Sequence, residues 1–162
     1  MARAQAFSLD LMIGAGALLI LLAAYFLSLS DLAARTSAFE AMRAARLRAL
    51  EASATLLASG EPAAWHALAE ANSSTMRALG LAGQPGVLEP AKLARLRAMD
   101  YNESRTLLGL EGLNWRLSVL SPNGTTLYAA GLPPEPEIQS IVVERAVVLN
   151  ASPAKLKLEV WR

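Results

Sequence analysis

The chain has 162 residues, a formal net charge of +1, no cysteine and a single histidine, His66. The length fits one ordinary domain, and a near-zero charge without a dense Lys/Arg patch gives no electrostatic reason to expect nucleic-acid binding. The lack of cysteine excludes disulfides, thiolate-bound zinc, iron–sulfur clusters and cysteine nucleophiles, and one histidine removes most metal sites and Ser–His catalytic sets. We therefore expect no catalytic residues, no metal and no cofactor.

The first feature along the chain is an uncharged apolar run from Leu11 to Ser30. A helix of this length reaches roughly 30 Å, the thickness of a bilayer core. Gly14 and Gly16 lie inside the run, where small residues let a second helix approach closely. A buried helix of a soluble protein is one alternative, but the remaining chain is too small to enclose it. A removable secretory signal is another, but such a signal has a shorter apolar core and a cleavage site after it. The run instead continues without Pro or Gly into an Ala-rich stretch, which predicts a transmembrane helix continuous with the next one.

The residues before this run are Arg3-Ala4-Gln5-Ala6, within the longer stretch "RAQAFSLD". This stretch resembles the N-termini of archaeal type IV pilin-like proteins, which carry class III signal peptides. The resemblance implies that a prepilin peptidase recognises Arg3 and cuts between Ala4 and Gln5, so that the apolar helix stays in the product. Two features depart from the pattern: no Gly stands at the cut, and Asp10 becomes the sixth mature residue, whereas bacterial pilins carry their Glu fifth.

Asp10 is a carboxylate at the edge of an apolar span, where an unpaired charge is costly. Cleavage creates a new α-amino group, which is positive at neutral pH. In a bundle of parallel helices, Asp10 could pair with the amine of a neighbouring subunit and fix its register. The alternative is a cytoplasmic flank residue whose carboxylate reaches the membrane interface.

Two features disagree about the side of the membrane on which the C-terminal part lies. Arg35, Arg43, Arg46 and Arg48 follow the span and only Arg3 precedes it, which by the positive-inside rule leaves that part in the cytoplasm. N-x-Ser/Thr sequons favour export and possible N-glycosylation, and they include all asparagines but Asn114; they begin at Asn72, Asn102, Asn123 and Asn150. Because the arginines lie on a helix and not in a short loop, we give the sequons and the class III motif more weight and expect an extracellular C-terminal domain.

Residues 31–59 are rich in Ala, Leu, Arg and Glu, which predicts that the helix continues to a stop at Ser59-Gly60-Glu61-Pro62. One broad apolar face is expected to pack on the head at one end and on neighbouring subunits along its length; it consists of Leu32, Phe39, Met42, Leu47, Leu50, Ala54 and Leu57. The alternative is a solvated amphipathic helix.

A second helix is predicted at about 62–79, with an apolar stripe that ends before Gly80; the stripe contains Trp65, Leu68, Met76 and Leu79. Asn72 lies on the same stripe, so either it is buried and unglycosylated or it caps a new helix. His66 lies off the stripe, where we expect a surface or structural role. A loop at 83–86 and a short helix from Glu89 to Asp100 follow.

From Trp115 the apolar residues alternate, which indicates β-strands. The predicted strands are 115–119, 126–130, 138–149 and 155–162, with a hairpin turn at Pro122-Asn123-Gly124-Thr125 and a stiff loop at Leu132-Pro133-Pro134-Glu135-Pro136. They predict a four-stranded antiparallel sheet, polar on one face and packed against helix on the other.

Together these segments predict an α+β chain with a long N-terminal helix and a small head. The parts are a leader at 1–4, a hydrophobic transmembrane and assembly helix at 5–30, its continuation at 31–60, the helical and loop part of the head at 61–112, and its sheet at 113–162. A long helix leading into a small antiparallel head is the architecture of pilins, and "LLGLEG…WRLSVLSPNGTTL" and "VVERAVVLN" are also similar to the heads of archaeal pilin-like proteins.

The resemblance implies a structural subunit, major or minor, of an archaeal type IV pilus-like surface filament. Its partners would be membrane lipid before assembly, copies of itself, the prepilin peptidase and the assembly platform. The alternative is an uncleaved single-pass anchor with a small extracytoplasmic sensing or binding domain. A membrane-anchored hydrolase would need an acid/base pair, and Glu135 and Glu137 are better interpreted as solvated charges of a Pro-rich loop.

Overall fold

The computed structural model describes residues 2–68, 71–72, 74–135 and 139–162, and their side chains from Leu11 onward. The chain divides into two units, Met1–Arg43 and Ala44–Arg162, and the first helix, α1 (Ala2–Leu56), contributes to both. We describe each unit by itself.

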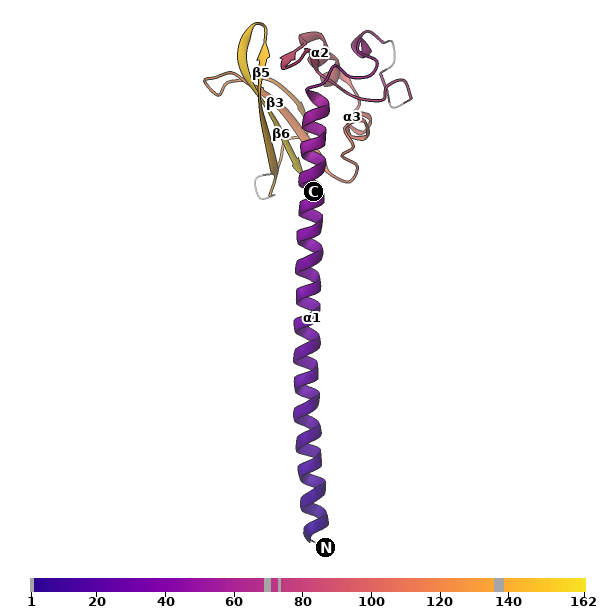
Figure 1. Cartoon of the computed structure of the whole chain (residues 1–162), viewed down its shortest axis with the longest axis vertical. Helices are drawn as coiled ribbons and strands as arrows, with labels where there is room; N and C mark the ends of the chain where they lie inside the picture. The colour runs from indigo at the N-terminus through magenta and orange to yellow at the C-terminus, as the bar shows by residue number, and fades with distance from the viewer. Residues whose placement is uncertain (1, 69–70, 73, 136–138) are drawn as a thin grey trace. The chain divides into compact units, whose positions relative to one another are not determined.

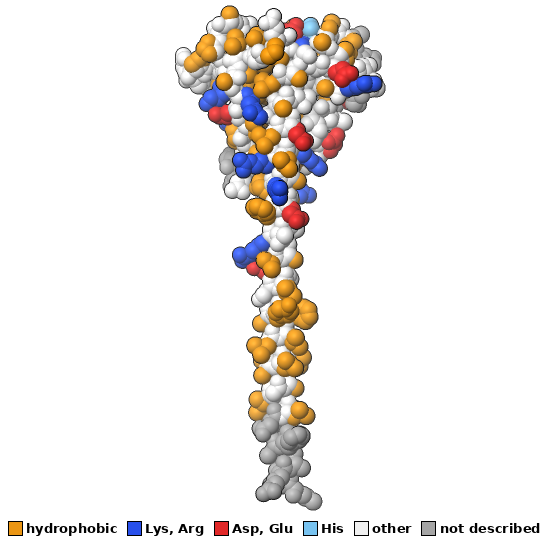
Figure 2. Space-filling view, viewed as in Figure 1, with side chains coloured by type: hydrophobic (Ala, Val, Ile, Leu, Met, Phe, Trp, Pro, Cys, Tyr) orange, Lys and Arg blue, Asp and Glu red, His pale blue; other side chains and the backbone are white. Residues whose placement is uncertain are grey.

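The first unit is the greater part of α1, and its large apolar side chains are exposed from Leu11 onward (Figure 2). Ile20, Phe26 and Leu27 are 71, 65 and 70% exposed. Ser28, Ser30, Thr36 and Ser37 each donate to a carbonyl oxygen three or four residues earlier in the helix, Ser28 to that of Ala24 at 2.9 Å. The helix thus hides its own polar groups while leaving its apolar surface uncovered, as a membrane-spanning helix does.

The second unit has an α+β core in which the last turns of α1 pack against a sheet. The buried face of this part of α1 consists of small residues and one leucine: Ala49, Ala52, Ser53 and Leu56. The predicted face was wrong in part: Leu57 packs against this core, but Leu47 and Leu50 remain 53 and 38% exposed. Small side chains allow a helix to approach its neighbour more closely, so the alanine face makes the contact. The helix ends at Leu56, before the predicted stop.

In the described part of the chain the sheet has six strands, in the order β1-β2-β5-β6-β3-β4. Figure 1 labels three of them, β3, β5 and β6. They are β1 (Ala82–Gln84), β2 (Val87–Leu88), β3 (Asn114–Leu120), β4 (Thr126–Gly131), β5 (Ile141–Leu149) and β6 (Ser152–Trp161). The β2–β5 pair is parallel and the other pairs are antiparallel.

The four predicted strands are therefore present, although the one predicted at 138–149 begins at Ile141 and residue 138 lies outside the described residues. The prediction of a purely antiparallel four-stranded sheet was wrong. The segment at 83–86 that was interpreted as a loop lies within the β1–β2 hairpin, which joins the sheet through β5. The amide of Val148 donates to the carbonyl oxygen of Gly86 at 2.8 Å. The two strands are too short to show an alternating pattern, so only this pairing identifies them.

The two faces of the sheet differ as predicted. The inner face is apolar and buried, and it includes Trp115, Leu117, Val119, Leu156, Leu158 and Val160. On the outer face, Lys155 and Glu144 form an ion pair at 3.0 Å and Lys157 and Glu159 one at 2.8 Å.

Short helices cover the inner face of the sheet: η1 (Trp65–Ala67, a 3-10 turn), α2 (Pro90–Ala98) and α3 (Tyr101–Leu107). The predicted helix at 62–79 was wrong, since the described residues of this range form a 3-10 turn, η1, and otherwise turns and irregular backbone. The helix predicted at 89–100 is α2. Asp100 does not belong to it and instead caps α3, accepting from the amides of Asn102 and Glu103 at 2.9 and 3.1 Å.

Candidate functional site

The residues predicted to direct processing and assembly all lie on α1. Arg3, Ala4, Gln5 and Asp10 belong to its helical backbone, but their side chains lie outside the described part of the chain. The predicted pairing of Asp10 and the cut after Ala4 therefore stay predictions.

Gly14 and Gly16 open two gaps in the surface of α1. A Cβ atom built on either glycine would meet no other atom within 4 Å. Nothing described in the same chain fills the space that the missing side chains leave. A second helix could approach the α1 backbone there.

α1 is also long and apolar enough to cross a membrane from Leu11 onward, and none of its most apolar stretch is buried. The length and composition of a secretory signal pass the same test. This surface therefore supports a candidate single-pass membrane helix near the N-terminus.

The four sequon asparagines lie in different environments. Asn123 and Asn150 are exposed in the β3–β4 and β5–β6 turns. Asn102 is exposed in the first turn of α3, but Ser104 of the same sequon is buried and donates to the carbonyl oxygen of Tyr101 at 2.9 Å. The two turn asparagines are thus the most accessible positions for a glycan.

Asn72 has a capping role. Its side-chain oxygen accepts from the amides of Ser74 and Thr75 at 3.0 and 3.1 Å, which orders a turn. Neither predicted alternative was right: Asn72 is only partly buried and lies in no helix, and what it orders is a turn and not the start of a new helix.

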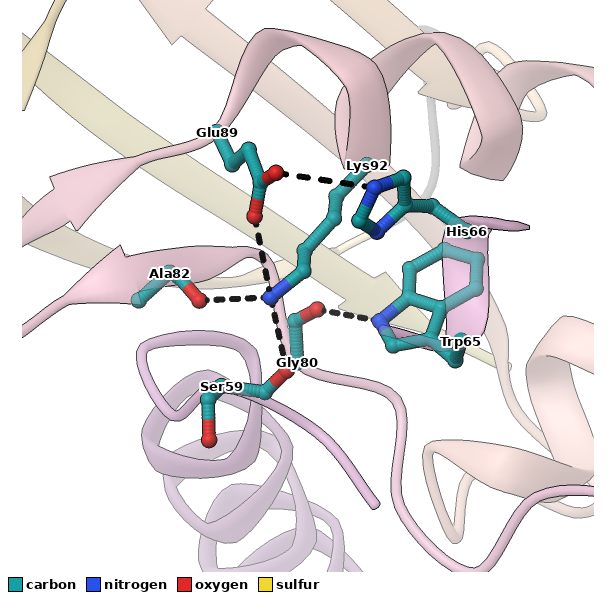
Figure 3. Close-up of polar contacts among 7 residues, drawn as sticks. All are labelled: Ser59, Trp65, His66, Gly80, Ala82, Glu89 and Lys92. Atoms are coloured by element: carbon teal, nitrogen blue, oxygen red, sulfur yellow. Dashed lines mark hydrogen bonds and ion pairs between the residues drawn. The ribbon is translucent and has the colours of Figure 1, made fainter. Parts of the chain in front are cut away.

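The head contains a buried polar cluster that the sequence analysis missed (Figure 3). Lys92, on α2, is only 2% exposed. Its Nζ donates to the carbonyl oxygens of Ser59 and Ala82 at 2.9 and 2.8 Å and lies 3.2 Å from Oε2 of Glu89. A buried ammonium group is stable only with such partners. Lys92 therefore joins the chain just after α1, strand β1 and the start of α2.

His66 and Trp65 extend this cluster on the other side of Glu89. Nε2 of His66 lies 3.6 Å from Oε1 of Glu89, and the indole N–H of Trp65 donates to the carbonyl oxygen of Gly80 at 2.7 Å (Figure 3). The structural role expected for His66 agrees with this position. One feature of the sequence could have indicated that Lys92 is buried. Lys92 lies four residues before Leu96, which is buried, and residues i and i+4 share one face of a helix.

Tyr128 fixes strand β4 to α2. Its hydroxyl donates to the carbonyl oxygen of Leu93. Burial raises the pKa of this phenol from 10.0 to about 12, against the opposing effect of the nearby Arg97 charge. The hydroxyl therefore stays protonated, and able to donate this hydrogen bond, to a higher pH than an ordinary tyrosine.

Within the described ranges no cluster of three or more His, Asp or Glu side chains could hold a metal ion. The perturbed group at Tyr128 is engaged with backbone, and His66 lies beside Glu89 in a cluster that holds the fold together.

Comparison of the chain with protein-family models, with curated proteins and with solved structures gives no match.

Proposed function

We propose that this chain is a structural subunit, a major or minor pilin, of an archaeal type IV pilus-like surface filament. The observation that carries the proposal is the uncovered apolar surface of α1, directly after the motif Arg3-Ala4-Gln5. Its helix enters the filament after prepilin-peptidase cleavage, and the head faces water.

The apolar surface of α1 needs a cover outside its own chain. Covering a side chain such as Leu19 or Phe26, 66 and 65% exposed, is worth about 1.5–3 kcal/mol when burial is complete. Lipid provides this cover before assembly and neighbouring α1 helices provide it afterwards. Because lipid tails are as apolar as leucine, association of the helices needs close packing and polar pairing besides burial. The open gaps at Gly14 and Gly16 serve the first need, and Asp10 serves the second.

Asp10 carries the specificity of this assembly. An Asp at the centre of a membrane helix costs about 2.5–3.5 kcal/mol on insertion scales, and near the edge the cost is smaller. Pairing with the α-amine at Gln5 of a neighbouring copy removes much of that cost and sets the stagger between helices. Asp31 is a natural control, because it already pairs with Arg35 of its own helix at 2.9 Å.

The first experiment determines the intact mass and N-terminal sequence of the protein extracted from its host's membrane or surface fraction. A start at Gln5, with added glycan mass, supports export and processing. A start at Met1 or Ala2 without glycan contradicts the proposal. It favours an uncleaved single-pass anchor whose domain lies inside the cell, in accord with the arginines after the span. Replacing Ala4 by Trp is expected to block processing.

The second experiment compares Asp10→Ala with Asp31→Ala. Both variants should insert and be processed, because neither change alters the apolar run or the cleavage motif. Filaments should form with Asp31→Ala but not with Asp10→Ala, as judged by electron microscopy of sheared surface fractions. Normal assembly of Asp10→Ala would show that this carboxylate does not guide subunits.

A further inference from the structure

Two neighbouring pockets lie along helix α2 and strand β4. The wider pocket has a volume of about 440 Å³ and lies between α2 and the start of β4. The narrower one has a volume of about 210 Å³ and lies where both elements end. Arg97 lines both pockets, and Tyr128 connects strand and helix by its hydrogen bond to the carbonyl oxygen of Leu93. We call the two pockets together the α2–β4 groove.

The lining of the groove is largely apolar, with a single charge where the two pockets adjoin. Ala94 and Leu127 line the wider pocket, and Tyr101 and Trp115, whose rings stack with centroids 5.7 Å apart, line the narrower one. Arg97 is the one charged residue in the lining of either pocket. It is exposed and forms no ion pair within the described part of the chain. The groove therefore fits apolar side chains at its two ends and an acidic group between them.

The two edges of the sheet differ in how they are covered. At edge strand β1, the amide of Ala82 donates to the carbonyl oxygen of Ala58 at 3.0 Å, and the Ala82 carbonyl oxygen accepts from Nζ of Lys92 at 2.8 Å. Strand β4 pairs with β3 and with no other strand in the described part of the chain. It contains no charged residue and no proline, with which proteins usually protect an exposed edge, and its bulge lies at its start. β4 is therefore the edge that is open to a further strand.

The register of β4 shows which of its backbone groups face the open side. The amide of Leu132 donates to the carbonyl oxygen of Trp115 on β3 at 3.1 Å. Only every second residue of a strand exchanges hydrogen bonds with one antiparallel neighbour, so Ala130 also faces β3. Ala129 and Gly131 consequently present their amides and carbonyl oxygens to the other side. An added strand could pair with these groups and place alternate side chains in the groove.

From this arrangement we infer that the α2–β4 groove binds an extended segment of a partner protein, which adds a strand to β4 and pairs an acidic side chain with Arg97. Side chains on one face of a strand recur every two residues, and four residues span about 13 Å. A segment with two apolar residues four positions apart and Glu or Asp midway thus matches the two pockets and Arg97. The inference goes beyond the proposed filament and does not depend on it, because the head alone forms the groove.

The groove also bears on glycosylation, because Asn150 lines the wider pocket. A glycan on Asn150 would occupy the space that the added segment needs. The inference therefore requires an unmodified Asn150, whereas Asn123 lines neither pocket and is free to carry a glycan. Peptide mass mapping of the protein from its host tests this requirement, and a glycan on Asn150 would overturn the inference.

Binding of a designed peptide tests the chemistry of the groove. The probe is Thr-Leu-Thr-Glu-Thr-Leu-Thr with blocked ends and a fluorophore, and its twin has Lys in place of Glu. Fluorescence anisotropy with the full chain in detergent should give a Kd below about 1 mM for the Glu peptide, at least about tenfold tighter than for the Lys peptide. Arg97→Glu should reverse this preference, whereas Arg77→Glu, at an 85% exposed position outside the groove, should leave it unchanged. Absence of saturable binding, or equal affinity for both peptides, would overturn the inference.

Variants of α2 and β4 test where the peptide lies. Ala94→Trp fills the wider pocket, whereas Ala91→Trp places the same ring at an exposed position of α2 that lines neither pocket. The first should weaken binding of the Glu peptide at least about tenfold and the second should leave it unchanged. Ala129→Pro removes an amide that the added strand needs but that β3 does not use, so it should also weaken binding. An affinity that neither Ala94→Trp nor Ala129→Pro lowers would overturn the inference.

Hydrogen exchange distinguishes an added strand from a ligand that only fills the pockets. The amides of Ala129 and Gly131 should exchange at least about tenfold more slowly when the Glu peptide is bound, while that of Gly124 in the β3–β4 turn should not change. Unchanged exchange at Ala129 and Gly131 with the peptide bound would overturn the added strand. None of these measurements needs filaments, so the failure of this inference and the failure of the proposed function are separate results.

Discussion

The buried ammonium group of Lys92 allows the sharpest test of how the head is held together. Lys92→Met keeps the length and apolar stem of the side chain but removes its charge. The carbonyl oxygens of Ser59 and Ala82 then lose their donor, at 2.9 and 2.8 Å, and Glu89 loses its cation at 3.2 Å.

The expected loss of stability follows from these contacts. Each hydrogen bond from a charged donor contributes about 1.5–3 kcal/mol. Removal of one partner from a buried ion pair costs about 3–5 kcal/mol, and the lower half of that range applies here because the Glu89 side chain is 33% exposed. We expect Lys92→Met to lower the free energy of unfolding by about 3–4 kcal/mol. For a domain of this size that lowers Tm by roughly 10–15 °C.

The measurement is thermal unfolding of the full chain in detergent, followed by near-ultraviolet circular dichroism. This signal comes mainly from rings packed in the head, such as those of Trp65 and Trp115, which are buried. The matched control is Lys155→Met, because Lys155 and Glu144 form a pair at 3.0 Å but are 52 and 46% exposed. An exposed pair contributes less than about 1 kcal/mol. If the two variants unfold at the same temperature, Lys92 does not join these segments as we describe.

Two further predictions concern Gly80 and Tyr128. A Cβ atom at Gly80 would lie 2.2 Å from the backbone atoms Ala58 O and Gly60 N, so Gly80→Ala should lower the unfolding free energy by about 1–3 kcal/mol or more; Gly83→Ala, with its nearest contact at 3.5 Å, should leave the Tm nearly unchanged, and equal Tm values would contradict the packing. Since the pKa of Tyr128 is raised to about 12 in the folded head, its contribution to stability is fully present below pH about 10 and falls as pH rises to about 12. Tyr128→Phe should therefore have a shallower loss of unfolding free energy between pH 10 and 12 than the parent chain, and parallel denaturation curves over this range would refute the assignment.

The long strands could be predicted from the sequence because one face of the sheet is buried and the other is exposed to solvent. Lys155, Lys157 and Glu159 alternate with Leu156 and Leu158, so burial enforces a period of two in the sequence itself. The β1–β2 hairpin shows no such period. Val87 and Leu88 become a strand because β5 offers them an unpaired edge, which is a property of the assembled sheet.

The helices show the same division. α2 was predictable from Pro90 in its first turn and from Leu93 and Leu96 on one face. The stripe through Trp65 was misinterpreted because 3.6-residue spacing also arises by chance around a turn, and the hydrogen bond from Trp65 to Gly80 holds that segment in another conformation. Propensity is a weak guide wherever a tertiary contact of this kind competes with it.

The sequence alone determined the apolar helix, its length and the position of Asp10, because hydrophobicity and local helix propensity act within one segment. It also determined the polar and apolar faces of the strands predicted at 115–119 and 155–162. Only the tertiary structure decided that Ala49 and Ala52, and not Leu47 and Leu50, contact the head, that Lys92 is buried among backbone carbonyls, and that Arg97 lies in a pocket. Those outcomes depend on which surfaces meet after the chain has folded, and no local pattern records that choice.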